Sequence, residues 1–140
     1  MPTVVRSRSL AVEPEQAWRL IADPHNLPRW WPETVRVESV EGAPGSRRSR
    51  FTQVFETSKG RPVRADYRIT ESTARERLVW EQQIDGTPFE KFLRAAVLEF
   101  RIAADGAIGS RVTLEALAEQ VPCPLHDRLG RNRGFQTDSA

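Results

Sequence analysis

The chain has 140 residues, of which 39% are hydrophobic and 29% are charged, as in one ordinary globular domain with a sizeable core. Its 21 basic and 19 acidic residues give a net charge of +2, which does not indicate a nucleic-acid partner. No apolar run approaches the roughly 20 residues of a membrane span. Residues 1–10 lack the apolar core of a signal peptide, so we expect a cytoplasmic protein.

Side chains that bind metals or act as nucleophiles are scarce. Cys123 is the single cysteine, which excludes an internal disulfide and a multi-cysteine zinc site. His25 and His126 lie far apart in the chain, so no metal site is expected. There is no phosphate-binding glycine motif and no serine-hydrolase elbow. We therefore expect no cofactor.

The N-terminal part predicts a strand followed by a helical corner. Residues 3–10 indicate the strand, and residues 12–32 indicate two short helices. Pro14 suits the first position of the first helix. Asp23 is expected to cap the second helix, which Pro28 keeps short.

Three of the four tryptophans lie in this corner. Trp18 and Trp30 fit apolar helical faces, so we expect both to be buried against a sheet. Neighbouring helical side chains diverge by about 100°. We therefore expect Trp31 to point away from the core that holds Trp30, toward a cavity mouth or the surface.

The rest of the chain predicts strands joined by turns. Alternating apolar and polar residues indicate strands at 34–41, 50–57, 63–70, 78–85, 89–104 and 111–120. Glycine, proline and polar clusters between them indicate turns. Such spacing predicts an antiparallel meander with one buried face, and the helices make it an α+β fold.

The helical corner followed by this run of strands resembles the START/Bet v 1-like superfamily, in its polyketide cyclase/dehydrase and lipid-transport branch. The matching residues are Pro14, Trp18, Ile21, Asp23, Pro24, Trp30 and Pro32, followed by residues 35–40. The resemblance implies a helix-grip fold. In that fold a curved antiparallel sheet of about seven strands, with two short N-terminal helices, grips a C-terminal helix over a cavity.

The C-terminus departs from that pattern. Residues 1–121 are expected to form the domain, and residues 122–140 a short helical or disordered tail. Pro122, Pro124 and Gly130 oppose a long helix there, so the C-terminal helix should be short or missing. The uncovered apolar face would then be covered by a homodimer, by another chain's helix, or by the tail despite these residues.

The inward faces of the strands supply the candidate ligand-binding residues. They are Trp31, Phe51, Gln53, Phe55, Tyr67, Trp80, Gln82, Phe89, Leu98 and Phe100. An apolar wall with a few polar groups is typical of a small-molecule pocket. Tyr67 is the one catalytic candidate on this face. The charged candidates are expected on the outer face, in cross-strand ion pairs: Asp66, Glu99, Glu115, Arg50, Arg68 and Arg94.

Three functions remain open. The first is a cytoplasmic binding protein for a hydrophobic, polyketide- or lipid-like molecule held on the concave face of the sheet. The second is a cofactor-independent enzyme that resembles aromatase/cyclases. The third is a protein-interaction module that resembles chaperone activators. In each case we expect no nucleic-acid partner and no membrane span, and a homodimer is a further expectation.

Overall fold

The computed structural model describes residues 3–121, so the predictions for residues 122–140 lie outside the described residues. In chain order the elements are β1 (Thr3–Leu10), α1 (Pro14–Ala22), the 3₁₀ helix η1 (Pro24–Asn26), α2 (Leu27–Trp30), β2 (Thr34–Glu41), β3 (Arg50–Glu56), β4 (Pro62–Thr73), β5 (Arg77–Gln83), the 3₁₀ helix η2 (Pro88–Lys91), β6 (Leu93–Asp105) and β7 (Gly109–Gln120).

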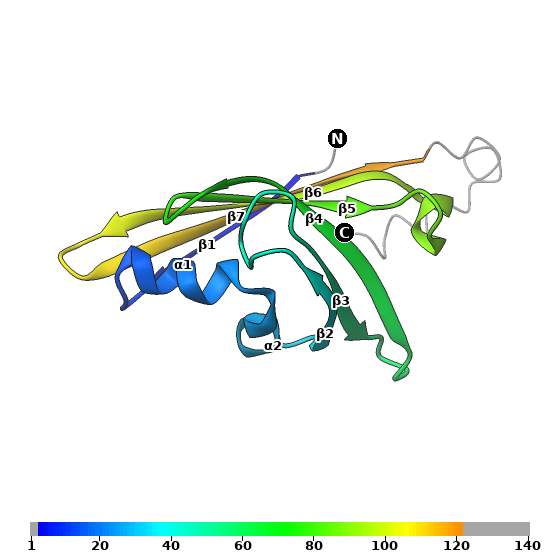
Figure 1. Cartoon of the computed structure of the whole chain (residues 1–140), viewed down its shortest axis with the longest axis horizontal. Coiled ribbons are helices and arrows are strands. Elements are labelled where there is room, and N and C mark those ends of the chain that lie inside the picture. Colours follow the sequence, from blue (N-terminus) through cyan, green and yellow to red (C-terminus); the bar gives the residue numbers. More distant parts are fainter. Residues whose placement is uncertain (1–2, 122–140) are drawn as a thin grey trace.

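The strands form one antiparallel sheet of seven strands in the order β1-β7-β6-β5-β4-β3-β2. Strands β2 to β7 follow one another as a meander, and β1 pairs with β7. Figure 1 shows that the sheet curves and that α1 and α2 lie on one side of it. We call the side that carries the helices the inner face. This arrangement confirms the predicted α+β helix-grip architecture.

The helical corner forms as its sequence predicts. Pro14 occupies the start of α1, where its missing N–H costs nothing. The Asp23 carboxylate accepts a hydrogen bond of 3.0 Å from the backbone N–H of His25 and so caps η1. Ala17 and Ile21 of α1 are buried in the core. Trp18 and Trp30, which were both expected to be buried, are instead half-buried against it.

One expected strand begins later than predicted. Residues 89–104 were expected to form one long strand with a bent or bulged start, but the chain first forms η2, and β6 begins at Leu93. Pro88 fits the first turn of η2, and the Thr87 hydroxyl accepts a hydrogen bond of 3.2 Å from the N–H of Phe89. This local cap stabilises the 3₁₀ turn over an extended start.

The expectation for Trp31 was wrong. The Trp30 and Trp31 rings lie 5.9 Å apart, centroid to centroid, and both contact the Trp80 ring. Trp31 follows the last residue of α2 and has an extended backbone, with φ −122° and ψ 90°. The helical angle of about 100° between neighbouring side chains therefore does not apply.

Candidate functional site

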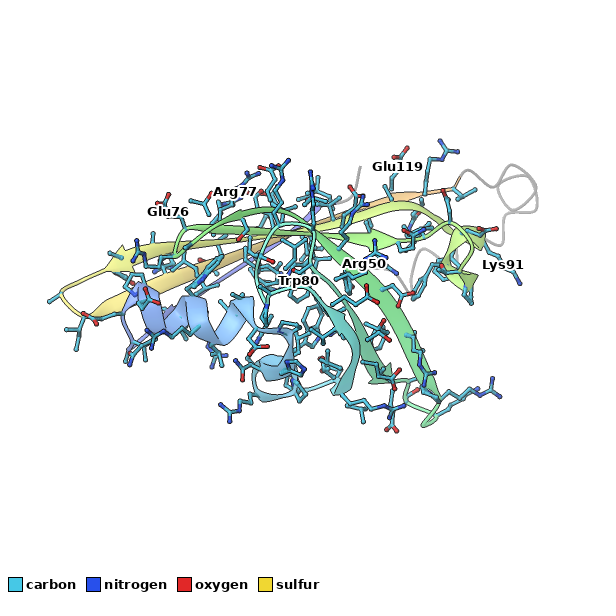
Figure 2. The ribbon with its side chains drawn as sticks, in the orientation of Figure 1. Arg50, Glu76, Arg77, Trp80, Lys91 and Glu119 are labelled. Atoms are coloured by element: carbon cyan, nitrogen blue, oxygen red, sulfur yellow. The ribbon has the colours of Figure 1, made fainter. Side chains whose placement is uncertain are left out.

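Six aromatic side chains meet on the inner face. We call them the aromatic cluster: Trp30, Trp31, Phe51, Tyr67, Trp80 and Phe100. Trp80 is at the centre and is only 1% exposed. Its ring lies 4.8 Å from Phe100, 4.9 Å from Phe51 and 5.2 Å from Tyr67, measured between centroids. In Figure 2, Trp80 points to the side of the sheet that carries α1, whereas Arg77 and Glu119 point to the other side.

Strand register and the helical corner assemble this cluster. Phe51 of β3 is the register partner of Tyr67 of β4, and Trp80 of β5 is the partner of Leu98 of β6. Side chains paired in this way lie on the same face of a sheet. Trp30 and Trp31, at the end of α2, then pack onto Trp80 from the helical side.

The ten predicted ligand-binding residues lie on the helix-bearing side of the sheet, but their side chains differ in solvent exposure. Phe51, Gln53, Tyr67, Trp80, Leu98 and Phe100 are buried beneath other side chains. Trp31, Phe55, Gln82 and Phe89 are half-buried. Phe89 contributes from η2, where its ring packs 5.8 Å from that of the exposed Phe92.

Several buried polar atoms near the cluster have no hydrogen-bond partner among the described residues. The donors are Trp30 Nε1, Trp80 Nε1 and Gln82 Nε2, and the acceptor is Gln53 Oε1. Gln53 satisfies its other end by donating a hydrogen bond of 2.7 Å to Thr34 Oγ1. The contact with Thr34 and the unpartnered indole N–H groups were not predicted from the sequence, because a hydrogen-bond partner depends on tertiary placement.

Tyr67 is the titratable group of the aromatic cluster. Burial raises the pKa of its phenol to about 12. The hydroxyl therefore stays protonated at neutral pH, where it can donate a hydrogen bond but cannot act as a ready general base. The sequence correctly placed Tyr67 on the inner face.

Beside the aromatic cluster, the inner face carries small side chains instead of large ones. On β6 and β7, Ala96 pairs with Ala118, and Leu98 pairs with Ala116. Ala96, Ala116 and Ala118 are half-buried. We call these three residues the alanine floor. Because alanine is small, this part of the face lacks the bulk that fills the region around Trp80. The sequence predicted which residues of β7 face inward, but not which residues of β6 would pair with them.

The outer face carries a continuous ion network across four strands. Arg77 of β5 bonds to Glu71 of β4 and to Glu99 of β6. Arg101 then lies 3.1 Å from Glu99 and 3.2 Å from Glu115 of β7. The hydrogen bonds that Arg77 donates to Glu99 and, to a smaller extent, to Glu71 raise the pKa of Arg77.

The other charged candidates also point away from the aromatic cluster. Arg68 pairs with Glu81 at 3.3 Å, and Arg94 pairs with Glu119 at 3.7 Å. Asp66 accepts a hydrogen bond from Thr52, and Arg50 is exposed beside them. The predicted outer-face placement of these charges is therefore confirmed.

Two cavities occur away from the centre of the cluster. The first, of about 310 Å³, is lined by Ser39, Glu41, Arg50, Phe51, Thr52, Asp66, Tyr67, Arg68 and Gln83. The second, of about 300 Å³, lies where β5 and β6 separate beyond the Glu81–Val97 pair, and is lined by residues 81–85 and 94–97. Trp80, Leu98 and Phe100 line neither cavity.

Two kinds of feature are absent from residues 3–121. These residues contain no group of three or more histidine, cysteine, aspartate or glutamate side chains placed to hold a metal ion. Within the same range, no helix is long and apolar enough to cross a membrane.

Comparison with solved structures shows that the chain has the helix-grip fold. Residues 1–131 match the family described as polyketide cyclase / dehydrase and lipid transport, and the chain belongs to that family. No curated protein matches the chain.

Similar solved structures share the fold at low sequence identity. A major latex-like protein from Panax ginseng is 16% identical, with a TM-score of 0.70 over 86% of this chain and 80% of that one. A START superfamily protein from Mycobacterium smegmatis is 16% identical, with a TM-score of 0.67 over 98% and 92%. The di-domain aromatase/cyclase BexL of the BE-7585A pathway is 21% identical, with a TM-score of 0.68 over 99% and 43%.

Proposed function

We propose that the protein binds a hydrophobic small molecule on the inner face of its sheet, against the alanine floor and the edge of the aromatic cluster. The observation that carries this proposal is the contrast between the bulky aromatic cluster and the three small side chains beside it. An apolar surface with a few fixed polar groups suits a small-molecule ligand. Membership of a family described by polyketide and lipid ligands supports the same class.

The unpartnered polar atoms suggest what the ligand carries. Three of the four are N–H donors: Trp30 Nε1, Trp80 Nε1 and Gln82 Nε2. A buried donor without a partner costs about 1–3 kcal/mol. A ligand with carbonyl or hydroxyl oxygens would compensate part of that cost, whereas a pure hydrocarbon would not. We therefore propose a polyketide- or lipid-like molecule with oxygen acceptors.

Binding is favoured over catalysis by the chemistry of Tyr67. A cyclase needs groups that move protons, and Tyr67 is the titratable group within the aromatic cluster. With a pKa near 12, this phenol can polarise a ligand carbonyl by donating a hydrogen bond but cannot accept a proton at neutral pH. An aromatase/cyclase-like activity is the second candidate, with Tyr67 as its hydrogen-bond donor. A cytoplasmic location and a homodimer are further parts of our proposal.

A substitution that fills the alanine floor tests the proposed site. N-phenyl-1-naphthylamine is a neutral apolar probe whose fluorescence rises on binding, and we expect saturable binding to the full chain. Ala116→Phe should weaken that binding at least tenfold because its ring would occupy the space over the floor. Ala103→Phe is the control, because Ala103 lies exposed on the same β6–β7 hairpin.

Thermal melting shows whether each variant is folded. Absence of probe binding to the unmodified chain, or equal binding by a folded Ala116→Phe variant and the unmodified chain, would contradict the proposed site.

A further inference from the structure

Two arginines of the edge strand β1 lie on the inner face. Arg6 is the register partner of Leu114, and Arg8 is the partner of Val112. Leu114 and Val112 pack against the core, and paired residues share a face. Ser7, between the arginines, lies on the outer face, where its hydroxyl contacts that of Thr113 at 3.1 Å. Arg6 and Arg8 therefore flank the apolar inner face from its edge.

No carboxylate neutralises these arginines within the described part of the chain. Arg6 donates a single long hydrogen bond of 3.4 Å to the carbonyl of Val5. The side chain of Arg8 makes no hydrogen bond or ion pair to any residue in the range 3–121. On the outer face, in contrast, Arg77 and Arg101 each contact two carboxylates.

The register connects this edge to the proposed ligand site. One inner-face row runs from Arg6 through Leu114 and Phe100 to Leu78. The next runs from Val4 through Ala116 and Leu98 to Trp80. With strands about 4.8 Å apart, the row from β1 to β5 spans roughly 14 Å, and Arg6 and Arg8 are separated by roughly 7 Å along their strand.

We propose that Arg6 and Arg8 bind the anionic group of an amphipathic ligand whose apolar part lies over the alanine floor. This inference rests on the proposed function and narrows the ligand to a molecule that carries a carboxylate, phosphate or sulfonate. Two guanidinium groups can share such an anion, and charge-assisted hydrogen bonds are the strong ones. The span of roughly 14 Å fits an anionic group at β1 and a ring system or chain that reaches the aromatic cluster.

A second role for the same arginines follows from their position. Charged side chains that point inward on an edge strand also discourage edge-to-edge pairing of that strand with another chain. That role predicts an effect on association between chains but no effect on the affinity for a small anion. Probe binding therefore separates the two roles.

A matched pair of probes tests the proposal. The compound 1-anilinonaphthalene-8-sulfonate is N-phenyl-1-naphthylamine with one added sulfonate, so the two differ in a single anionic group. We expect the full chain to bind the sulfonate probe roughly fivefold more tightly than the neutral one, since the arginines are exposed. The variant Arg6→Gln/Arg8→Gln should lose this preference and keep its affinity for the neutral probe.

The control removes the same charge elsewhere. Arg29→Gln/Arg61→Gln changes two exposed arginines on α2 and on the β3–β4 turn, and should keep the preference for the sulfonate probe. The preference should also fall with added salt. Equal affinity for both probes in the unmodified chain, or equal loss in both double variants, overturns this inference alone. Failure of the neutral probe to bind overturns the proposed function as well.

Discussion

At the scale of the residue, the two faces of the sheet differ sharply: Trp80 packs against other aromatic rings on the inner face, whereas Arg77 pairs with Glu71 and Glu99 on the outer face. Sequence alternation predicted Tyr67 and Trp80 on the inner face and Arg68 on the outer face, and the structure confirms both placements. The prediction succeeded because successive side chains of a strand point to opposite faces of the sheet. It failed at Trp31, because the residue that ends a helix follows no helical period. Unpartnered atoms such as Trp80 Nε1 could not be predicted, since they depend on tertiary neighbours.

The titration of Tyr67 gives a prediction at this scale. Tyr67 is the chain's one tyrosine, so ultraviolet absorbance of the phenolate reports it alone. The folded protein should titrate with a pKa of about 12, because burial disfavours the charged phenolate. In denaturant the pKa should return to about 10. A midpoint near 10 in the folded protein would show that the phenol is solvated.

The same shift predicts how stability depends on pH. Below pH 10 the phenol is protonated in both states, so it contributes no pH dependence. Between pH 10 and 12 the unfolded chain loses its proton first, so the free energy of unfolding should fall as pH rises. The loss should be about 2 kcal/mol over this interval and should approach about 2.7 kcal/mol at higher pH. Urea unfolding of the unmodified chain and of Tyr67→Phe checks this, since the variant should lack that contribution.

At the scale of the element, the bounds of strands were predicted well where apolar and polar residues alternate over many positions. The extended segments on either side of the β3–β4 and β6–β7 turns were predicted within a few residues. The start of β6 was wrong because a two-residue signal, Thr87 followed by Pro88, decides between a 3₁₀ turn and a strand. A local hydrogen bond of this kind can override a weak alternation of apolar and polar residues, and the sequence alone does not show which of the two prevails.

The β2–β3 turn packs closely against α1, and this contact can be tested. Gly45 has φ +77°, and a Cβ added there would lie 2.7 Å from the Cβ of Ala22. Gly60 has almost the same φ of +78°, but a Cβ there would meet no atom within 4 Å. Both alanine variants should therefore lose about 1 kcal/mol from backbone strain. Gly45→Ala should lose a further 1–3 kcal/mol from overpacking.

Urea unfolding of the two variants measures the difference. Because the backbone strain is nearly equal, the excess loss in Gly45→Ala reports the contact between the turn and α1. Equal losses in Gly45→Ala and Gly60→Ala would show that the turn moves freely away from the helix.

At the scale of the whole molecule, α1 and α2 cover only part of the inner face. Figure 1 shows both helices beneath one end of the sheet, on the side away from η2. Among the described elements, α1 contacts β6 and β7, and α2 contacts β2. The alanine floor lies on β6 and β7 and stays half-buried. A half-exposed apolar face of this kind is often an interaction surface.

We predict that a second copy of the chain covers this face when no ligand is bound. Pairing of two β1 strands is disfavoured, because Arg6 and Arg8 of both copies would meet at that edge. The dimer should instead join through the inner faces. Light scattering at micromolar concentration should then give twice the mass of the chain. Ala118→Arg should give the monomer mass, because it places a charge in the interface, whereas the exposed Ala103→Arg should leave the dimer intact. A monomer in the unmodified protein would rule out this assembly and leave the inner face to the small-molecule ligand alone.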